Sequence, residues 1–176
     1  MLAPMKPGDH PEFFRFPAPE GRFWHEGNLV EHAKLAQAMH GWVGRHPDDG
    51  RYILTNGYDW TYFTVDDAPY FVRSVRVEPD AVVLELSDGS EEPWDPAASR
   101  IGANEALYTR VKAASGGGPF EAKFTRFAQA QLAPVLDETG SSPGGRGAGA
   151  IGARIGGRIV RIGGSSDSIP PSKCAS

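Results

Sequence analysis

The sequence predicts an α+β fold, and three observations carry this prediction. Short apolar runs bounded by Gly, Pro, Asn and Asp recur along the chain, which is typical of antiparallel strands. Two other segments carry apolar residues at three- and four-residue spacing, which is typical of amphipathic helices. The 176 residues are 40% hydrophobic and 10% aromatic, which is enough for one main core built from two small modules.

The first 90 residues are expected to form a proline-rich arm over 1–20 and an N-terminal α+β module over 21–90. Each proline in the arm fixes φ and removes a backbone donor, so the arm should be extended. Short strands over 22–24 and 28–30 flank a turn in which Gly27 supplies the positive φ of a tight hairpin. A helix is expected over 32–43. Its buried stripe would consist of Leu35, Ala38, Met39 and Trp42, with His40 facing water.

Three or four strands are expected to complete this module. Segments 51–55 and 58–65 flank Asn56-Gly57, the dipeptide best suited to a type I′ hairpin because both central residues take positive φ. Segments 70–77 and 81–86 follow, each ended by turn residues. The sequence therefore predicts an antiparallel meander.

A second, C-terminal hairpin-helix module is expected over 91–136. Segment 106–112 and a short strand over 120–123 precede a helix that Thr125 should cap and Pro134 should end. The buried stripe of this helix would be Phe124, Phe127, Ala128 and Leu132. Hairpin and helix then occur twice in the same order. Both a structural duplication and a chance coincidence of short apolar stripes remain open.

Residues 137–176 are expected to form a disordered, basic tail rich in glycine and serine. From residue 139 onward there are ten glycines, seven serines and no aromatic residue, too little apolar surface to offset the entropy of ordering. Gly147, Gly149 and Gly152 have the spacing of a dinucleotide-binding loop. Neither a strand before them nor a helix after them is expected, so composition explains the spacing.

The formal net charge of −4 is unevenly distributed. Residues 1–138 hold 13 basic and 21 acidic residues, whereas residues 139–176 hold five basic residues and one acidic residue. An acidic body repels phosphate backbones, so nucleic acid would have to be bound through the tail. No apolar run reaches the roughly 18 residues that span a bilayer, and no apolar signal segment begins the chain. We therefore expect a cytoplasmic location without membrane contact.

No motif for nucleophilic, metal or cofactor chemistry is recognisable. The chain has no G-x-S-x-G, phosphate-binding loop or H-E-x-x-H motif, and the five histidines lack ligand spacing. We therefore expect no metal and no cofactor. Alternation along 58–65 places Tyr62 on an aromatic strand face, which is either core or the wall of a pocket.

Three segments together resemble the bacterial domain of unknown function 1285 (DUF1285) family over about residues 21–136. They are the Trp24-His25-Glu26-Gly27 hairpin, the stretch Phe63-Thr64-Val65-Asp66-Asp67-Ala68-Pro69-Tyr70, and Ala106-Leu107-Tyr108-Thr109-Arg110-Val111. The resemblance implies a two-module α+β fold of repeated hairpin, helix and sheet, a ligand cleft between the modules and a signalling role. It brings no enzymatic activity. Carried over by position, it singles out Asp67, Pro69, Tyr70, Tyr108 and Arg110.

Three functional hypotheses follow from these residues. The first is a non-catalytic module that binds a small ligand or a protein partner, in which Arg110 pairs with an anionic group. Tyr62 and Tyr108 would wall this site, Tyr70 would lie close by, and Asp67 would hold the loop. The second is an enzyme with an unrecognised acid/base site built on Asp67 and His25. The third is nucleic-acid binding through the basic tail.

Overall fold

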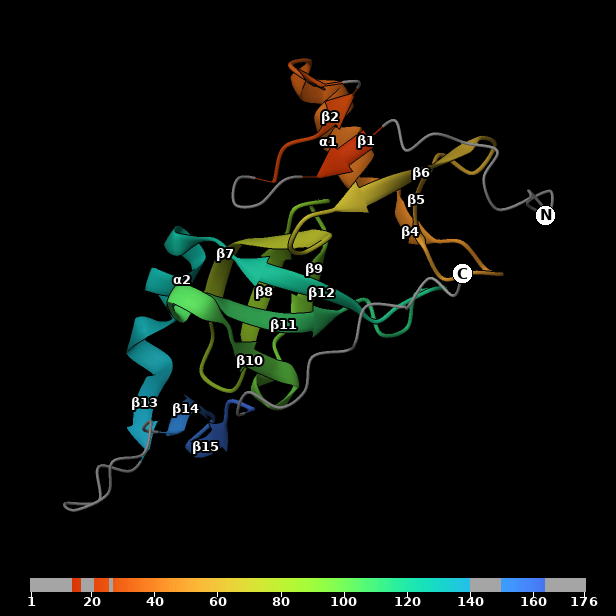
Figure 1. Cartoon of the computed structure of the whole chain (residues 1–176). Coiled ribbons are helices and arrows are strands. Elements are labelled where there is room, and N and C mark those ends of the chain that lie inside the picture. Colours follow the sequence, from red (N-terminus) through yellow and green to blue (C-terminus); the bar gives the residue numbers. More distant parts are fainter. Residues whose placement is uncertain (1–13, 17–20, 26, 140–149, 164–176) are drawn as a thin grey trace.

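The computed structural model describes residues 14–16, 21–25, 27–139 and 150–163, whose strands form three sheets (Figure 1). Most of the predicted arm lies outside the described residues. The strands of the first sheet are β1 (Phe14–Phe16), β2 (Trp24–His25), β3 (Asn28–Leu29), β4 (Val43–Arg45), β5 (Tyr52–Thr55) and β6 (Trp60–Val65), and helix α1 (Ala33–Gly41) lies between β3 and β4 in the chain. The strands of the second sheet are β7 (Tyr70–Val77), β8 (Val82–Leu86), β9 (Glu91–Pro93), β10 (Ser99–Ile101), β11 (Leu107–Val111) and β12 (Phe120–Phe124), and helix α2 (Arg126–Leu132) follows β12. Three short 3₁₀ turns, η1 (Pro96–Ala98), η2 (Ala103–Glu105) and η3 (Ala133–Val135), connect elements, and β13 (Leu136–Thr139), β14 (Ala150–Ile155) and β15 (Arg158–Arg161) form the third sheet.

The first sheet has the strand order β3-β2-β1-β6-β5-β4. The predicted hairpin around Gly27 is present, with Trp24 opposite Leu29 and a positive φ of 81° at Gly27. β1 joins this hairpin to β6, antiparallel to β2 and parallel to β6. Part of the predicted arm is therefore a strand inside the sheet.

Helix α1 is shorter than predicted and buries a different face. The Nδ1 atom of His32 accepts a hydrogen bond from the Leu35 backbone at 3.2 Å, so His32 is the N-cap instead of the first helical residue. Met39 and His40 are buried, whereas Leu35 is 43% exposed and Ala38 is exposed. The predictions of a buried Leu35 and Ala38 and of a solvent-facing His40 were wrong, because α1 contacts the body mainly through its last turn.

The predicted hairpin at Asn56-Gly57 joins β5 to β6, but its turn is longer than type I′. Thr55 is opposite Trp60, which leaves four residues in the turn. The Asn56 side-chain oxygen accepts hydrogen bonds from the backbones of Tyr58 and Asp59, at 2.9 and 2.8 Å. Only Gly57 takes a positive φ. The asparagine therefore organises the turn through its side chain.

The second sheet has the order β10-β11-β12-β7-β8-β9 and contains the predicted meander. β12 runs parallel to β7, with Ala122 opposite Tyr70. The two edge strands of this sheet, β9 and β10, lie close together in the chain, and Trp94, just after β9, donates from Nε1 to Ser99 Oγ on β10 at 2.9 Å. Strands on both sides of residue 90 share this sheet, so a division between modules after residue 90 passes through it.

Helix α2 covers one end of the second sheet (Figure 1). The predicted cap is confirmed: Thr125 Oγ1 accepts from the Ala128 backbone at 3.1 Å. Ala128 and Leu132 are fully buried as predicted, but Phe127 is 64% exposed. Phe127 was wrongly placed in the buried stripe, since a helix of seven residues buries only one narrow face.

The third sheet corrects the prediction of a disordered tail for residues 137–139 and 150–163. β14 pairs with β13 and β15, and Ala153 and Ile162 join the hydrophobic core. Gly163 forms an isolated parallel bridge with Arg100, which attaches this sheet to the edge of the second one. The rest of the predicted tail, 140–149 and 164–176, lies outside the described residues.

The order of elements recurs as the repeated pattern predicted, although the repetition of whole modules stays a hypothesis. A hairpin, a helix and a three-stranded antiparallel set follow one another as β2–β3, α1 and β4–β6, and again as β11–β12, α2 and β13–β15. Neither α1 nor α2 is long and apolar enough to cross a bilayer, and the described part of the chain has no other α-helix.

Candidate functional site

The first polar cluster lies on the outer face of the second sheet. Asp67, in the loop between β6 and β7, accepts hydrogen bonds at Oδ2 from Tyr108 on β11 (3.2 Å) and from Lys123 on β12 (2.6 Å). The β11–β12 register places Tyr108 opposite Lys123, so both side chains emerge together. The three residues fasten the β6–β7 loop to the sheet. Asp67 thus connects the loop to β11 and β12.

These contacts fix the protonation states of the cluster. Burial, followed by the hydrogen bond to Asp67, raises the pKa of the Tyr108 hydroxyl above its ordinary value. Burial lowers the pKa of Lys123, but its hydrogen bond to Asp67 and the carboxylate charge outweigh burial and raise it overall. Tyrosine therefore keeps its proton and lysine its charge at neutral pH, which suits binding better than proton transfer.

The ring of Tyr108 is enclosed by the strand next to it. The Arg100 guanidinium on β10 lies 4.1 Å from the ring centroid, and its Nε donates to Glu121 at 2.7 Å. A Cβ added at Gly102 would come within 2.6 Å of Tyr108 Cε2. Glycine is therefore needed at position 102 for the ring to occupy this place.

Arg110 lies two residues beyond Tyr108 on β11 and so on the same outer face. It is exposed, and its register partner across the strands is Glu121. Glu121 is engaged by Arg100, and within the described residues the Arg110 side chain forms no hydrogen bond or ion pair. Arg110 is thus a cation beside a cluster whose other charges are paired.

Tyr62 belongs to a separate cluster on the first sheet. Its hydroxyl donates to Asp49 Oδ2 at 2.7 Å, and the Arg51 guanidinium lies 3.5 Å from its ring centroid. Partial burial raises the pKa of Asp49, but hydrogen bonds from Tyr62 and Arg51 outweigh it and bring the pKa to about 2. None of the described contacts of Tyr62 involves the other candidate residues, so Tyr62 belongs to a different cluster from Tyr108.

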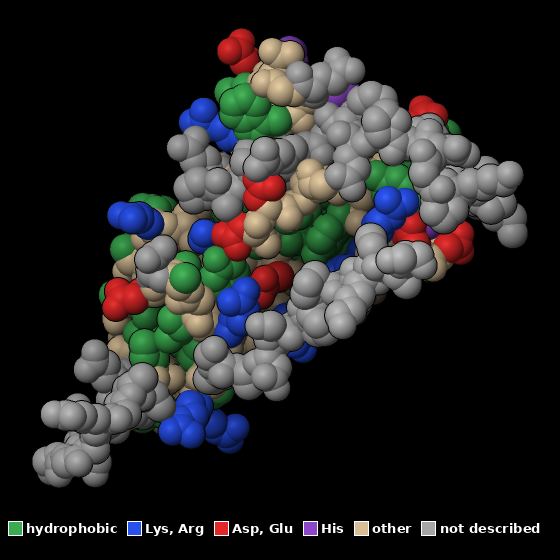
Figure 2. Space-filling view, viewed as in Figure 1, with side chains coloured by type: hydrophobic (Ala, Val, Ile, Leu, Met, Phe, Trp, Pro, Cys, Tyr) green, Lys and Arg blue, Asp and Glu red, His purple; other side chains and the backbone are tan. Residues whose placement is uncertain are grey.

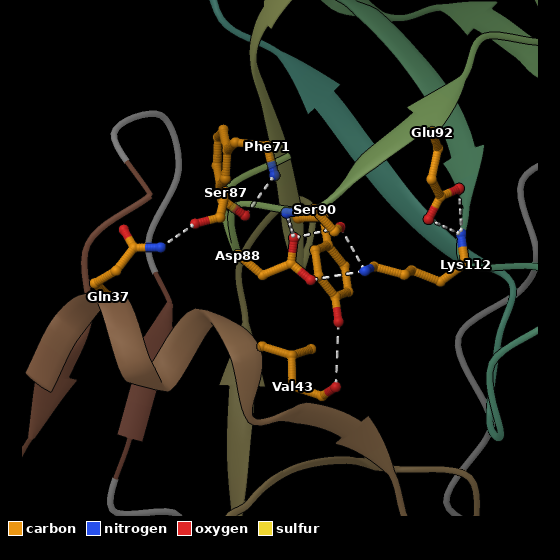
Figure 3. Close-up of polar contacts among 9 residues, drawn as sticks. Gln37, Val43, Phe71, Ser87, Asp88, Ser90, Glu92 and Lys112 are labelled. Carbon is orange, nitrogen blue, oxygen red and sulfur yellow. Dashed lines mark hydrogen bonds and ion pairs between the residues drawn. The ribbon is translucent and has the colours of Figure 1, made fainter. Parts of the chain in front are cut away.

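A third cluster lies where α1 and β4 meet the second sheet (Figure 3), and Tyr70 belongs to it through its contact with Val43. The Tyr70 hydroxyl donates to the Val43 carbonyl on β4 at 3.3 Å. Burial, with the nearby carboxylates Asp88 and Glu92, raises the pKa of Tyr70 well above its ordinary range. Gln37 on α1 donates to the Ser87 carbonyl at 3.1 Å, a second link between the first and second sheets. The hydroxyl of Tyr70 on β7 therefore connects the second sheet to β4 of the first sheet.

Lys112, at the end of β11, lies beside this joint and connects β11 to the β8–β9 segment of the second sheet. Its Nζ atom lies 2.7 Å from Asp88 Oδ2 and 2.6 Å from Ser90 Oγ, with the lysine and aspartate side chains only 16% and 11% exposed. Its backbone amide donates to both oxygens of Glu92, at 3.1 and 3.0 Å, and its φ is 57°. Burial raises the pKa of Asp88, but hydrogen bonds from Lys112 and Ser90 outweigh it and lower the pKa overall.

The structure therefore brings together only part of the predicted set. Asp67 and Tyr108 are hydrogen bonded and Arg110 shares their face, whereas Tyr62 and Tyr70 lie in two other clusters. Within the described part of the chain, Asp67 contacts Tyr108 and Lys123 and not His25, the partner assumed in the enzymatic hypothesis. No group of three or more His, Cys, Asp or Glu side chains that could hold a metal occurs among the described residues.

Three residues of these clusters were missed at the sequence level. The pattern Phe-Glu-Ala-Lys-Phe over β12 alternates, so it could have placed Lys123 on the outer face with Glu121. Arg100 lies between the expected segments 81–86 and 106–112, in the short strand β10, for which no strand was predicted. Nothing local marks Lys112, because its partners come from the turn between β8 and β9.

Two solved structures are similar to this chain. A DUF1285 family protein from Silicibacter pomeroyi DSS-3 has a TM-score of 0.62 and 17% sequence identity, covering 86% of this chain and 79% of that one. A DUF1285 family protein from Shewanella baltica OS155 has a TM-score of 0.54 and 17% identity, covering 70% of this chain and 91% of that one. No family model and no curated protein matches the sequence. The chain thus has a DUF1285-like fold, as its motifs indicated.

Proposed function

We propose that this chain is a non-catalytic binding module for a small anionic ligand, held on the outer face of β10–β12 with Arg110 as the principal contact. The observation that carries the proposal is the balance of charge on this face. Arg100 is paired with Glu121 and Lys123 with Asp67, so among the described residues of this face Arg110 is the cation without a carboxylate. A guanidinium binds carboxylate or phosphate groups in a bidentate manner.

The surroundings of Arg110 favour binding over catalysis. The phenol of Tyr108 keeps its proton, and the carboxylate of Asp67 accepts two hydrogen bonds from its own chain. Both groups are held in place before a ligand arrives, which lowers the entropy lost on binding. We include a regulatory role in the proposal, because a module that binds a ligand without converting it acts through a partner that recognises the ligand-bound form.

A thermal-shift screen tests this proposal. The panel should contain dicarboxylates, inorganic phosphate, sugar phosphates and nucleotides. A ligand at 100 times its Kd stabilises the fold by about 2.7 kcal/mol, which raises the Tm of a domain of this size by about 5 to 10 °C. Arg110→Ala should abolish the shift for every hit.

Arg126→Ala is the matched control. Arg126 is also exposed and forms no side-chain hydrogen bond or ion pair among the described residues, but it lies on α2. Hits that survive in Arg110→Ala, or that are lost equally in Arg126→Ala, would refute the proposed site. A panel without any hit would count against a small anionic ligand.

A further inference from the structure

One side of the first sheet is buried although it is not part of the main core. We call it the aromatic face, and it consists of His46, Ile53, Trp60 and Tyr62. The β5–β6 register places Ile53 opposite Tyr62, and alternation along β6 puts Trp60 on the same side. The His46 ring centroid lies 4.7 Å from that of Trp60 and 5.7 Å from that of Tyr62. His46, Ile53 and Tyr62 are only 3%, 2% and 5% exposed, yet none of them belongs to the core cluster that contains Phe63.

Within the described part of the chain, the loop between β4 and β5 lies against this face. The Arg51 guanidinium is 3.5 Å from the Tyr62 ring centroid and is paired with Asp49 at 3.0 Å. Side chains of both charges lie together at this end of the molecule (Figure 2). Met39 of α1 and Leu132 of α2 belong to the core cluster, so both described helices pack on the core side. Neither helix therefore accounts for the low exposure of the aromatic face.

The strand β1 directs the residues that precede it toward the aromatic face. β1 runs parallel to β6, with Phe14 opposite Phe63. β5 pairs with the first half of β6 on one side, and no described strand pairs with that half on the side of β1. Residues that precede Phe14 in the same register would lie opposite Tyr62, Thr61 and Trp60 in turn.

We propose that residues 1–13, which lie outside the described residues, dock on the aromatic face. In the continued register Phe13 lies beside Tyr62 and Pro11 beside Trp60, and alternation turns both side chains toward this face. Pro11 has no backbone donor, so it ends the strand pairing. This surface belongs to the first sheet and is separate from the ligand face at Arg110 on the second sheet.

The composition of residues 1–13 suits an aromatic surface. Pro4, Pro7 and Pro11 favour polyproline II, a conformation that aromatic-lined grooves bind because little entropy is lost on binding. Thirteen residues in this conformation extend about 40 Å. Three neighbouring strands span about 10 Å, so the segment is long enough to cross β6, β5 and β4. Because it is joined directly to β1, its effective concentration is about millimolar, and even a weak contact is populated.

His46 provides an independent observation. Its Nδ1 atom accepts a hydrogen bond from the Asp48 backbone at 3.3 Å, so the neutral ring carries its proton on Nε2. The Nε2 atom is buried and forms no hydrogen bond within the described part of the chain. A buried donor without an acceptor is destabilising. Docking brings backbone carbonyls of residues 1–13 to this face, and such a carbonyl is the acceptor that Nε2 lacks.

The test places a nitroxide spin label at position 6 of the full chain, through Lys6→Cys in a Cys174→Ser background, with ¹⁵N-labelled tryptophan. The indole signal of Trp60, identified by its loss in Trp60→Phe, should lose most of its intensity and recover when the label is reduced. The indole signal of Trp94, which follows β9 in the second sheet, should stay sharp and serves as the internal control.

Two substitutions in the segment form a matched pair, and neither alters a described residue. Phe13→Ser should weaken docking about tenfold, because it removes one buried aromatic side chain, and should restore most of the Trp60 signal. Leu2→Ser also removes an apolar side chain, but it lies outside the continued register and should leave the Trp60 signal broadened. Matching thermal melts should show that both variants fold.

Three results would overturn the proposal. One is a Trp60 signal that the label affects no more than it affects Trp94. A second is equal broadening in Phe13→Ser and Leu2→Ser, which would show that the tether alone brings the label near. A third is the same broadening of Trp60 when the label and the ¹⁵N nuclei are on different chains, which would make a second copy the source of the docked segment.

Discussion

His40 should make the stability of the fold depend on pH, and this effect tests how α1 packs. The side chain is 5% exposed and lies against Phe23, with ring centroids 5.0 Å apart. It is also influenced by the charges of Arg73 on β7 and Asp88 in the turn between β8 and β9. Burial is the main cause that lowers its pKa from 6.5 to about 4, and Arg73 lowers it further while Asp88 partly opposes both. The imidazole is therefore neutral in the folded protein at neutral pH.

The sign and size of the effect follow from this shift. Between pH 6.5 and about 4 the unfolded chain binds a proton that the folded chain excludes, so acid favours unfolding. The stability associated with neutral His40 is complete above pH 6.5 and is lost as the pH falls toward 4. Linkage gives a loss of about 2 kcal/mol by about pH 5, before most carboxylates titrate.

Urea unfolding at several pH values between about 7.5 and about 5 measures this loss, and His40→Leu should remove it. The substitution will also alter stability at neutral pH, so the quantity to compare is the change with pH and not the absolute value. His32→Asn is the control, because His32 is exposed and asparagine can replace it as N-cap. The same pH dependence in the wild type and in His40→Leu would refute the reasoning.

Two further substitutions test the polar clusters. Gly102→Ala should cost about 1 to 3 kcal/mol, because its Cβ would displace the Tyr108 ring, whereas Gly116→Ala, with open space around it, should be tolerated; equal Tm values would contradict this. Lys112→Met should cost about 2 kcal/mol in urea unfolding by leaving a largely buried carboxylate unpaired. Arg76→Met, which removes an exposed pair, should have no resolvable effect, and an equal loss in both variants would show that burial does not matter here.

Local signals were sufficient for the elements that local chemistry defines. The hairpin at Asn56-Gly57, the meander of β7 and β8 and the cap at Thr125 each depend on residues within a few positions of one another. The helical stripes were less informative. Leu35 and Phe127 fit the periodicity but face solvent, because periodicity shows that a face is apolar and not how much of it the body covers.

The third sheet shows why composition misled the prediction for residues 150–163. Glycine and serine dominate the tail as a whole, and the average concealed the alternation of β14 and β15. Ala153 and Ile162 are buried by strands from other parts of the chain, and the bridge between Gly163 and Arg100 spans 63 positions. Burial of this kind depends on partners that the local sequence does not contain.

The candidate site was predictable only as separate residues. Asp67 and Tyr108 are 41 positions apart, and the pairing of β12 with both β7 and β11 is what brings them into contact. The same topology explains why Tyr70 is elsewhere: it is the first residue of β7, and its side chain enters the joint with β4. A tyrosine, a lysine and an aspartate thus occur together twice. Tyr108, Lys123 and Asp67 lie on the outer face. Tyr70, Lys112 and Asp88 lie at the joint.

The contrast between these two clusters bears on function. At the joint, Lys112 and Asp88 are largely buried and satisfied by each other and by Ser90, so a ligand would have to break contacts that hold β11 to the turn between β8 and β9. On the outer face, Lys123 and Asp67 satisfy each other in the same way, but the pairing of Arg100 with Glu121 leaves Arg110 exposed beside them. An anion can bind there without disrupting an existing pair. For this reason the outer face, and not the more deeply buried joint, is the better candidate for binding.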